Sequence, residues 1–511
     1  MNRIAPHSIC SGMILVCMLM LAVPGTAQAD NEPEMITEKQ FIHDYLDTPE
    51  QMERFGRISD RIWFFAELGL QEFRSSELLA KTLEEEGFVA ERGLAGMPTC
   101  FVATYGSGQP VIGILAEFDA LPMISQKPMV AVQDPLVQGA PGHGCGHNVM
   151  GSASIAAAIA ARHAMEKFGI SGTIKVFGSP SEETVISRPY MIRAGLFDGV
   201  DVVIDNHLSH KFGTSYGVQG NAIYSARFTF TGRTAHSAGA PWSGRSAMDA
   251  VEIMNVATNY LREHLHYTHR LHYVVTQGGE APNVVPDKAA VWYYVRNTDD
   301  RIEDMWNRVV NCAKAAALAT DTELSEVRIF TAVHQKHASK ALAELMQVNI
   351  EQTGMPRWTE KDQAFARELQ AALGKDTTGM PLEVDSLKAP SGKFVGGGST
   401  DVGDVSLIAP TATIGFPGAV PGAIFHHWSL VACNHGSLAW KGLNAGARAI
   451  GTTAIDLLTD REALAAIRKE FEDYSREHPY KPLLPAESEP PLDLNRELME
   501  KWRGVMESTY E

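Results

Sequence analysis

Cysteine is scarce in this chain, which has six in 511 residues. Two of the six lie in an apolar N-terminal segment, and the other four are scattered, at Cys100, Cys145, Cys312 and Cys433. If Cys145 binds a metal ion, three thiols remain, and an odd, scattered set does not form a disulfide framework. Because 45% of the residues are hydrophobic, we expect a large core, rather than disulfide bridges, to stabilise the fold.

Positive charge is scarce as well, because 44 Lys and Arg residues face 61 Asp and Glu residues and give a net charge of −17. Loss of residues 1–29, in which Arg3 is the one formal charge, would change this value from −17 to −18. A strongly acidic surface argues against nucleic acid and against an anionic membrane surface as partners.

Long apolar runs are missing outside the N-terminus. There, residues 13–23 form an apolar core, and Ala27-Gln28-Ala29 provides small residues for cleavage. The run is too short to span a bilayer comfortably, and the pattern is typical of a secretory signal. We therefore expect residues 1–29 to be a cleaved signal peptide and the mature chain to be exported, to the periplasm or the medium, without a membrane anchor.

A glycine-rich heptapeptide, Gly-His-Gly-Cys-Gly-His-Asn at residues 142–148, places Cys145 and His147 between glycines. Glycine permits close backbone approach, so that both side chains can turn toward one point. A thiolate and a neutral imidazole are ligands for zinc and other first-row divalent ions. The alternative is a tight glycine turn with a buried cysteine and a surface histidine.

Ionisable residues follow three short apolar runs that we predict to be buried strands. Glu117 and Asp119 follow residues 111–116, Glu182 and Glu183 come after residues 173–178, and His207 comes after residues 202–205. Taken singly, a pair of glutamates is usually a solvated surface feature. Because sites form at the carboxyl ends of strands in open α/β sheets, the recurrence indicates one common site.

The middle of the chain has a different pattern. Residues 222–333 alternate as strand, helix, strand, strand, helix and strand, the order of a ferredoxin-like unit. We predict an α/β fold in which a mixed sheet flanked by helices forms one domain, from residues 30–221 and 335–481. An α+β module is inserted at 222–334, and a Pro- and Glu-rich tail at 482–511 is expected to be only partly ordered.

Five candidate ligands, enough for two adjacent divalent ions, come from these segments and from a C-terminal His-His-Trp motif: Cys145, His147, Glu183, His207 and His426. Two such ions can polarise a carbonyl and lower the pKa of a shared water. Glu182 is adjacent to a ligand but points elsewhere, so it is the candidate general base, and Asp119 would orient a ligand imidazole. For His207 and His426 taken alone, an ordinary hydrogen-bonded histidine is the alternative.

Several motifs cover nearly the whole mature chain in one order. Cys145-Gly146-His147 stands between the Glu-Phe-Asp-Ala-Leu-Pro run at 117–122 and the Glu182-Glu183 pair, and further motifs occupy residues 232–236, 279–286 and 398–405. Together they resemble the M20 metallopeptidases, in particular the amidohydrolase branch of hippurate and auxin-conjugate hydrolases. Asn148 and Ser181 depart from that branch, and the heptapeptide with the His-His-Trp motif at 426–428 is more similar to the group of p-aminobenzoyl-glutamate hydrolase B subunits.

The resemblance implies a zinc-peptidase-like catalytic domain with two divalent metal ions, Mn or Zn, held by the five ligands above, and Glu182 as general base and later acid. It also implies that the insert is a lid and dimerisation domain, so we expect a homodimer. His236 would then reach a neighbouring active site and stabilise the oxyanion, the alternative being a turn histidine. Asn283 and Arg296 match lid positions near the substrate, where an Arg can pair with a carboxylate, or else form a plain surface ion pair.

Four hypotheses remain for the function. The leading one is an exported amidohydrolase that cleaves an N-acyl or N-aroyl amino acid, such as p-aminobenzoyl-glutamate. A dipeptidase or N-acyl-amino-acid deacylase would use the same site. A catalytically silent metal- or peptide-binding protein is disfavoured by Glu182, which hydrolysis needs and binding does not. A thiol hydrolase with Cys145 as nucleophile would be independent of metal and sensitive to alkylation.

Overall fold

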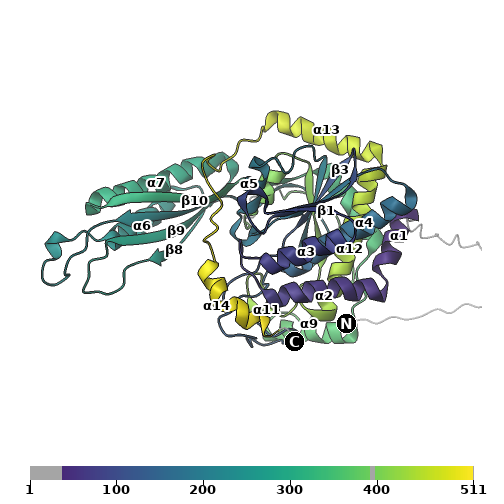
Figure 1. Cartoon of the computed structure of the whole chain (residues 1–511), viewed down its shortest axis with the longest axis horizontal. Coiled ribbons are helices and arrows are strands. Elements are labelled where there is room, and N and C mark those ends of the chain that lie inside the picture. The colour runs from purple at the N-terminus through teal and green to yellow at the C-terminus, as the bar shows by residue number, and fades with distance from the viewer. Residues whose placement is uncertain (1–36, 392–396, 510–511) are drawn as a thin grey trace, which may run out of the picture. The chain divides into compact units, whose positions relative to one another are not determined.

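A six-stranded sheet, in the order β1-β2-β4-β3-β5-β12, organises the larger part of the fold (Figure 1). The structure is a computed structural model that describes residues 37–391 and 397–509, so the expected signal peptide lies outside the described residues. The strands are β1 (Val89–Arg92), β2 (Phe101–Ser107), β3 (Val111–Ala116), β4 (Gly172–Gly178), β5 (Val202–Ser209) and β12 (Thr411–Pro417). Strands β4, β3, β5 and β12 are parallel, whereas β1 and β2 pair in antiparallel fashion. The predicted mixed sheet is confirmed.

Strand β3 shows how the sequence builds two cores. Ile112 and Ile114 belong to one core and Leu115 to the other, because successive side chains of a strand point to opposite faces. Both faces of the parallel part are therefore buried, which explains why β3 is apolar throughout.

Helices cover both faces of this sheet. The larger core contains residues from α1 (Thr37–Leu46), α2 (Pro49–Phe65), α3 (Phe73–Glu85), α4 (His147–Phe168), α8 (Lys340–Thr353), α9 (Glu360–Ala372), α11 (Trp428–Val431), α12 (Gly436–Thr459) and α13 (Arg461–Glu477). The smaller core contains residues from α5 (Ser187–Arg193) and α10 (Val402–Val405). Helix α4 packs closely against the end of β3 at Gly151, where a Cβ would stand 2.5 Å from the carbonyl oxygen of Glu117. Glycine at this position makes the close approach possible.

A second, four-stranded sheet has the order β10-β7-β9-β8, with every pair antiparallel. Its elements follow the predicted ferredoxin-like order: β7 (Ala222–Thr231), α6 (Ala247–Leu261), β8 (Arg270–Gln277), β9 (Lys288–Asn297), α7 (Asp299–Thr320) and β10 (Glu323–Val333). Apolar residues of both helices form one core with the sheet, so α6 and α7 cover the same face (Figure 1). Two short strands, β6 (Gly217–Gln219) and β11 (Lys336–Ala338), pair where the chain enters and leaves this unit.

The C-terminal tail is more ordered than its composition predicts. It contains α14 (Arg496–Glu507), which buries Met499 and Met506. The Arg503 guanidinium pairs with Glu67, a carboxylate that is 1% exposed, and also donates to the carbonyl oxygen of Gln71 at 2.8 Å. The tail is therefore tied to the turn between α2 and α3. Among the described residues, no helix has the length and apolar character to cross a membrane.

Candidate metal centre and active site

The predicted site residues gather beyond the carboxyl ends of β3 and β4 and at the end of β5. Glu117 and Asp119 follow β3, and a short 3-10 turn, Glu182–Thr184, follows β4. His207 lies within β5, which continues two residues further, to Ser209. Parallel strands thus deliver these side chains to the same edge of the sheet, as expected for an open α/β fold.

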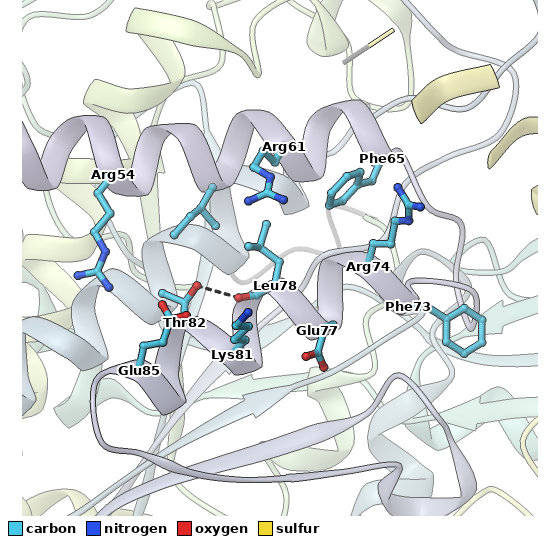
Figure 2. A pocket seen from close by; sticks show the side chains of 11 residues that line it. Arg54, Arg61, Phe65, Phe73, Arg74, Glu77, Leu78, Lys81, Thr82 and Glu85 are labelled. Carbon is cyan, nitrogen blue, oxygen red and sulfur yellow. Dashed lines mark hydrogen bonds between the residues drawn. The ribbon is translucent and has the colours of Figure 1, made fainter. Parts of the chain in front are cut away.

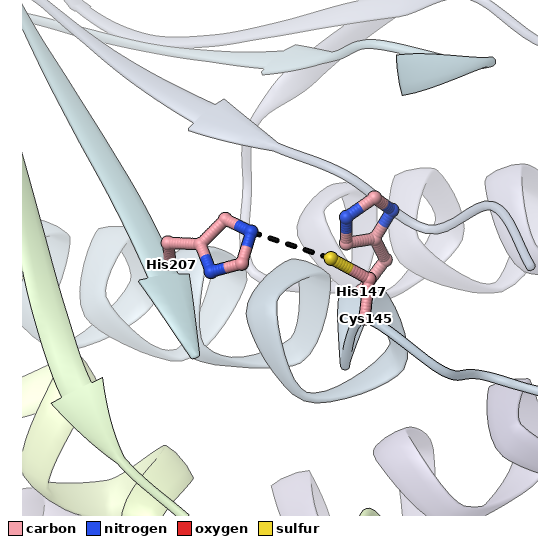
Figure 3. A group of neighbouring side chains, drawn as sticks. All are labelled: Cys145, His147 and His207. Carbon is pink, nitrogen blue, oxygen red and sulfur yellow. Dashed lines mark hydrogen bonds between the residues drawn. The ribbon is translucent and has the colours of Figure 1, made fainter. Parts of the chain in front are cut away.

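Cys145, His147 and His207 form the centre of the cluster (Figure 3). The Sγ atom of Cys145 lies 3.4 Å from Nε2 of His207. The Nδ1 atom of His207 donates to the carbonyl oxygen of Leu208 at 2.7 Å, which leaves the lone pair of its Nε2 directed at the thiol. Gly146 makes the turn possible, because its φ is +91° and a Cβ there would stand 2.4 Å from Leu208.

Two further groups extend the cluster: Cys145 with Glu183 and His426, and His147 with Glu117 and Glu182. In each group the potential ligand atoms lie within 4.8 Å of one another. His426 reaches the cluster from the C-terminal part of the chain, and its Nε2 lies 3.2 Å from Glu183 Oε2. All five predicted ligands are thus brought together.

Asp119 connects the imidazole of His147 to the backbone of Glu183, both of them candidate ligands. Its Oδ1 accepts from Nδ1 of His147 at 2.8 Å, and its Oδ2 accepts from the backbone N–H of Glu183 at 2.9 Å. The first bond fixes the tautomer of His147 with Nε2 free for a metal ion. Asp119 therefore stands where the sequence analysis expects an orienting residue.

The chemistry of the donor set fits divalent ions. Within the described residues, three buried atoms of the cluster have no hydrogen-bond partner: His147 Nε2, Glu117 Oε2 and Glu183 Oε1. Buried acceptors without partners are costly, and bound cations satisfy them. Zinc binds thiolate, imidazole and carboxylate ligands, and carboxylate is also a ligand that manganese prefers.

Burial sets the protonation of the cluster. Burial and the nearby Glu117 charge raise the pKa of Glu182 well above its ordinary value. Burial and the neighbouring His147 lower the pKa of His207 to about 4, so this ring is neutral at pH 7, the form that binds metal ions. Burial also raises the pKa of the Cys145 thiol, which opposes its use as a free thiolate nucleophile.

The cluster opens into a cavity of about 470 Å³. Its polar lining includes Arg296 from β9, Lys336 from β11 and Ser399 from the turn before α10. The Nε of Arg296 donates to Ser399 Oγ at 3.1 Å, and its guanidinium lies 4.8 Å from the ring centre of Tyr294. Lys336 lies 3.6 Å from Asp205, which also lines the cavity, so Arg296 is the lining cation that faces no carboxylate in this way.

A larger hollow of about 730 Å³ lies between α2 and α3, where Arg54, Arg61, Arg74 and Lys81 line it (Figure 2). Its lining residues include neither cysteine nor histidine. We therefore assign the reaction site to the smaller cavity, which contains the candidate ligands.

Comparison with known proteins agrees with this geometry. Residues 221–321 match the peptidase dimerisation domain of the M20 peptidases. The B subunit of the p-aminobenzoyl-glutamate hydrolase of Escherichia coli (strain K12) is 34% identical over 466 residues, which cover 86% of this chain and 96% of that protein. The chain belongs to the M20 peptidase family. It is therefore a hydrolase that acts on amide bonds.

Two further proteins are similar to this chain at lower sequence identity. The Xaa-Arg dipeptidase of Mus musculus is 27% identical over 463 residues, 88% of this chain and 95% of that protein. The solved structure of an aminobenzoyl-glutamate utilization protein from Klebsiella pneumoniae superposes with a TM-score of 0.53 and 18% identity, over 80% of this chain and 98% of that one. The second likeness shows the shared fold.

Two residues that the M20 resemblance assigns to the site do not line the cavity of their own chain. His236 and Asn283 are exposed on loops of the inserted unit. Nδ1 of His236 accepts from the backbone N–H of Gly239 at 3.0 Å, and the carbonyl oxygen of Asn283 accepts from the N–H of Ser237 at 3.1 Å. The second bond joins the two loops to each other.

Sequence reasoning misses two residues of this M20 site. It places Glu117 at the strand end without a role, yet Oε2 of this residue lies 3.4 Å from His147 Nε2. It does not single out Arg188, although this residue is fully buried and pairs with both Glu117 and Asp401. A lone arginine in a Ser-Arg-Pro context carries no recognisable motif, so sequence alone offers no signal for it.

Proposed function

We propose that this M20 enzyme hydrolyses the amide bond between an acyl or aroyl group and an amino acid, with p-aminobenzoyl-glutamate as the model substrate. The observation that carries the proposal is a set of buried potential metal-ligand atoms without hydrogen-bond partners, next to a cavity that Arg296 also lines. The names of the relatives support the same bond class.

The residues that would hold two divalent ions, Mn or Zn, are Cys145, His147, Glu183, His207 and His426. When bound, the ions would lower the pKa of a water molecule and polarise the substrate carbonyl. Glu182 lines the cavity and stands next to a ligand, so its carboxylate would take the proton from the attacking water and return it to the leaving nitrogen. Arg296 would bind a substrate carboxylate through its terminal nitrogens, while its Nε remains bonded to Ser399.

We also propose that the chain acts as a homodimer through the inserted unit. Strand β8 is an edge strand that exposes Val274 and Val275, and α6 exposes Ile253 and Val256. Exposed edges and apolar side chains of this kind are typical of a surface that another chain covers. In such a dimer, His236 and Asn283 of each chain would complete the active site of the other, with His236 donating to the developing oxyanion.

The first experiment tests the reaction class and the substrate together. We propose that the protein is exported and that its leader, residues 1–29, is cleaved, so the experiment uses residues 30–511. This mature chain is loaded with Mn or Zn. Amide cleavage is followed by mass spectrometry on p-aminobenzoyl-glutamate, hippurate, indoleacetyl-amino acids and plain dipeptides. We expect release of the amino acid from an aroyl or acyl substrate, and none with Glu182→Gln. Preference for plain dipeptides would favour the dipeptidase alternative, and tight metal binding without any cleavage would favour a binding protein.

The second experiment tests the shared site by mixing two inactive variants, His236→Ala and Glu182→Gln. In a mixed dimer, the chain with intact Glu182 receives His236 from its partner, so one of the two sites is complete. Because half of the dimers are mixed, activity should return to about a quarter of the wild-type value. No recovery after the protomers exchange would show that His236 does not act across the dimer.

A further inference from the structure

Arg188 lies behind the ligand cluster and holds two carboxylates. The side chains of Arg188 and Asp401 are 0% exposed and that of Glu117 is 4% exposed. Nη2 of Arg188 donates to Glu117 Oε1 at 2.7 Å, and Nη1 pairs with Asp401. Asp401 also accepts from the backbone N–H of Arg188 at 3.0 Å and from Ser187 Oγ at 3.1 Å. One guanidinium therefore fixes the orientation of both acids.

Arg188 is the one guanidinium for two buried carboxylates, so it alone does not balance their charge when both are ionised. Glu117 also lines the cavity that the candidate ligands line. A buried charge without compensation is strongly destabilising. A further cation near Glu117 would remove the imbalance.

The free oxygen of Glu117 shows where that cation would bind. Glu117 Oε2 has no hydrogen-bond partner in the described part of the chain and lies 3.4 Å from His147 Nε2, which also has none. Because Nδ1 of His147 donates to Asp119, the ring presents a lone pair at Nε2 in its neutral form, the form that binds a metal ion. Two acceptors thus face each other, an arrangement that a metal ion between them satisfies. Glu182 Oε2 lies 3.8 Å from the same nitrogen.

We propose that Glu117 is a further metal-binding residue of the centre and that Arg188 is its positioning residue. Arg188 occupies Oε1 and thereby turns Oε2 toward His147. Through Asp401 it also joins the ligand cluster to residues 397–400, which line the cavity and include Ser399, the partner of Arg296. The inference rests on the proposed function only in requiring that the centre binds divalent ions.

The test is metal binding to the chelator-stripped full chain, measured by titration calorimetry with Mn²⁺ and with Zn²⁺ alone. Glu117→Gln keeps an oxygen for Arg188 but turns an NH₂ group toward His147, so the fold is retained while a charged ligand is lost. Loss of a residue that orients a metal ligand weakens metal binding about 10- to 100-fold. Loss of a charged ligand itself should therefore weaken the binding of one ion at least as much. Glu166→Gln, at an exposed side chain that pairs with Arg162 in α4, is the matched control and should bind as wild type.

Further variants separate a binding role from a purely structural one. Arg188→Lys keeps the positive charge but cannot bind both carboxylates as the guanidinium does. It should lower the affinity for the same ion by a smaller factor. The double variant should bind no more weakly than Glu117→Gln alone, because both changes act on one ligand. Wild-type affinity of Glu117→Gln for both ions would overturn the inference, as would a lower melting temperature of the stripped protein without any change in metal affinity. If the wild-type chain itself binds no divalent ion, the proposed function fails rather than this assignment alone.

Discussion

The hydrogen bonds of Asp119 predict a large effect for the isosteric change Asp119→Asn. The buried carboxylate accepts from His147 Nδ1 at 2.8 Å and from the Glu183 N–H at 2.9 Å. An amide has one oxygen, so its NH₂ group must face one of these two donors. A hydrogen bond to a charged group contributes about 1.5–3 kcal/mol, and we expect the variant to lose about 2 kcal/mol of unfolding free energy without metal.

The same change should weaken metal binding about 10- to 100-fold, or about 1.4–2.7 kcal/mol. If the NH₂ group faces His147, the ring must take the other tautomer, and its Nε2 then carries a proton instead of a lone pair. If it faces Glu183, the turn that carries this ligand shifts. Either outcome disturbs one ligand.

The assays are denaturant unfolding of the stripped protein and calorimetric titration with Mn²⁺ or Zn²⁺. Asp134→Asn is the control, because Asp134 forms an exposed ion pair with Lys127 at 2.7 Å and should contribute less than about 1 kcal/mol. The reasoning is refuted if Asp119→Asn unfolds and binds metal as the wild type does.

Three further predictions follow from other parts of the structure. Glu182→Gln should lower kcat about 10²- to 10⁴-fold in a steady-state assay while calorimetry shows unchanged metal affinity. Burial opposes protonation of His334, but Asp299 and nearby charges outweigh it and raise its pKa from 6.5 to about 9. Protonated His334 therefore contributes at most about 3 kcal/mol to the free energy of unfolding, in full below pH 6.5 and progressively less as the pH rises through 9. The unfolding free energy of His334→Gln should lack this dependence on pH. Arg503→Met leaves Glu67 buried without its partner and should lower the unfolding free energy by about 3–5 kcal/mol, whereas a loss below 1 kcal/mol would mean that α14 is not anchored there.

Elements whose signal is local are predicted well from the sequence. Strand β3 (Val111–Ala116) has the bounds that its apolar run predicts. The ferredoxin-like pattern predicted over 222–333 begins with β7 at Ala222 and ends with β10 at Val333. Helices α9, α13 and α14 are not expected from the sequence, because they are mostly polar and each buries few apolar side chains. In the tail, the proline and glutamate content conceals a helix whose docking depends on the distant Glu67.

The candidate site is predictable as far as its residues lie in local motifs. Cys145 and His147 share one turn, and Glu182 and Glu183 share another, so spacing alone places them together. The contact of Arg188 with Asp401 joins positions 213 residues apart, and no local pattern encodes it. Both acids after β3 lie against His147, Asp119 at Nδ1 and Glu117 at Nε2. The second contact depends on the path of the loop in three dimensions, and for this reason the sequence assigns Glu117 no role.

Metal dependence of hydrolysis tests the central claim most directly. The chelator-stripped chain is titrated with Mn²⁺ or Zn²⁺, and release of glutamate from p-aminobenzoyl-glutamate is measured at each addition. The account predicts no release from the stripped protein and a rate that rises to a plateau at about two ions per chain. Full activity in excess chelator, lost on alkylation of Cys145, would contradict it and point to a thiol hydrolase.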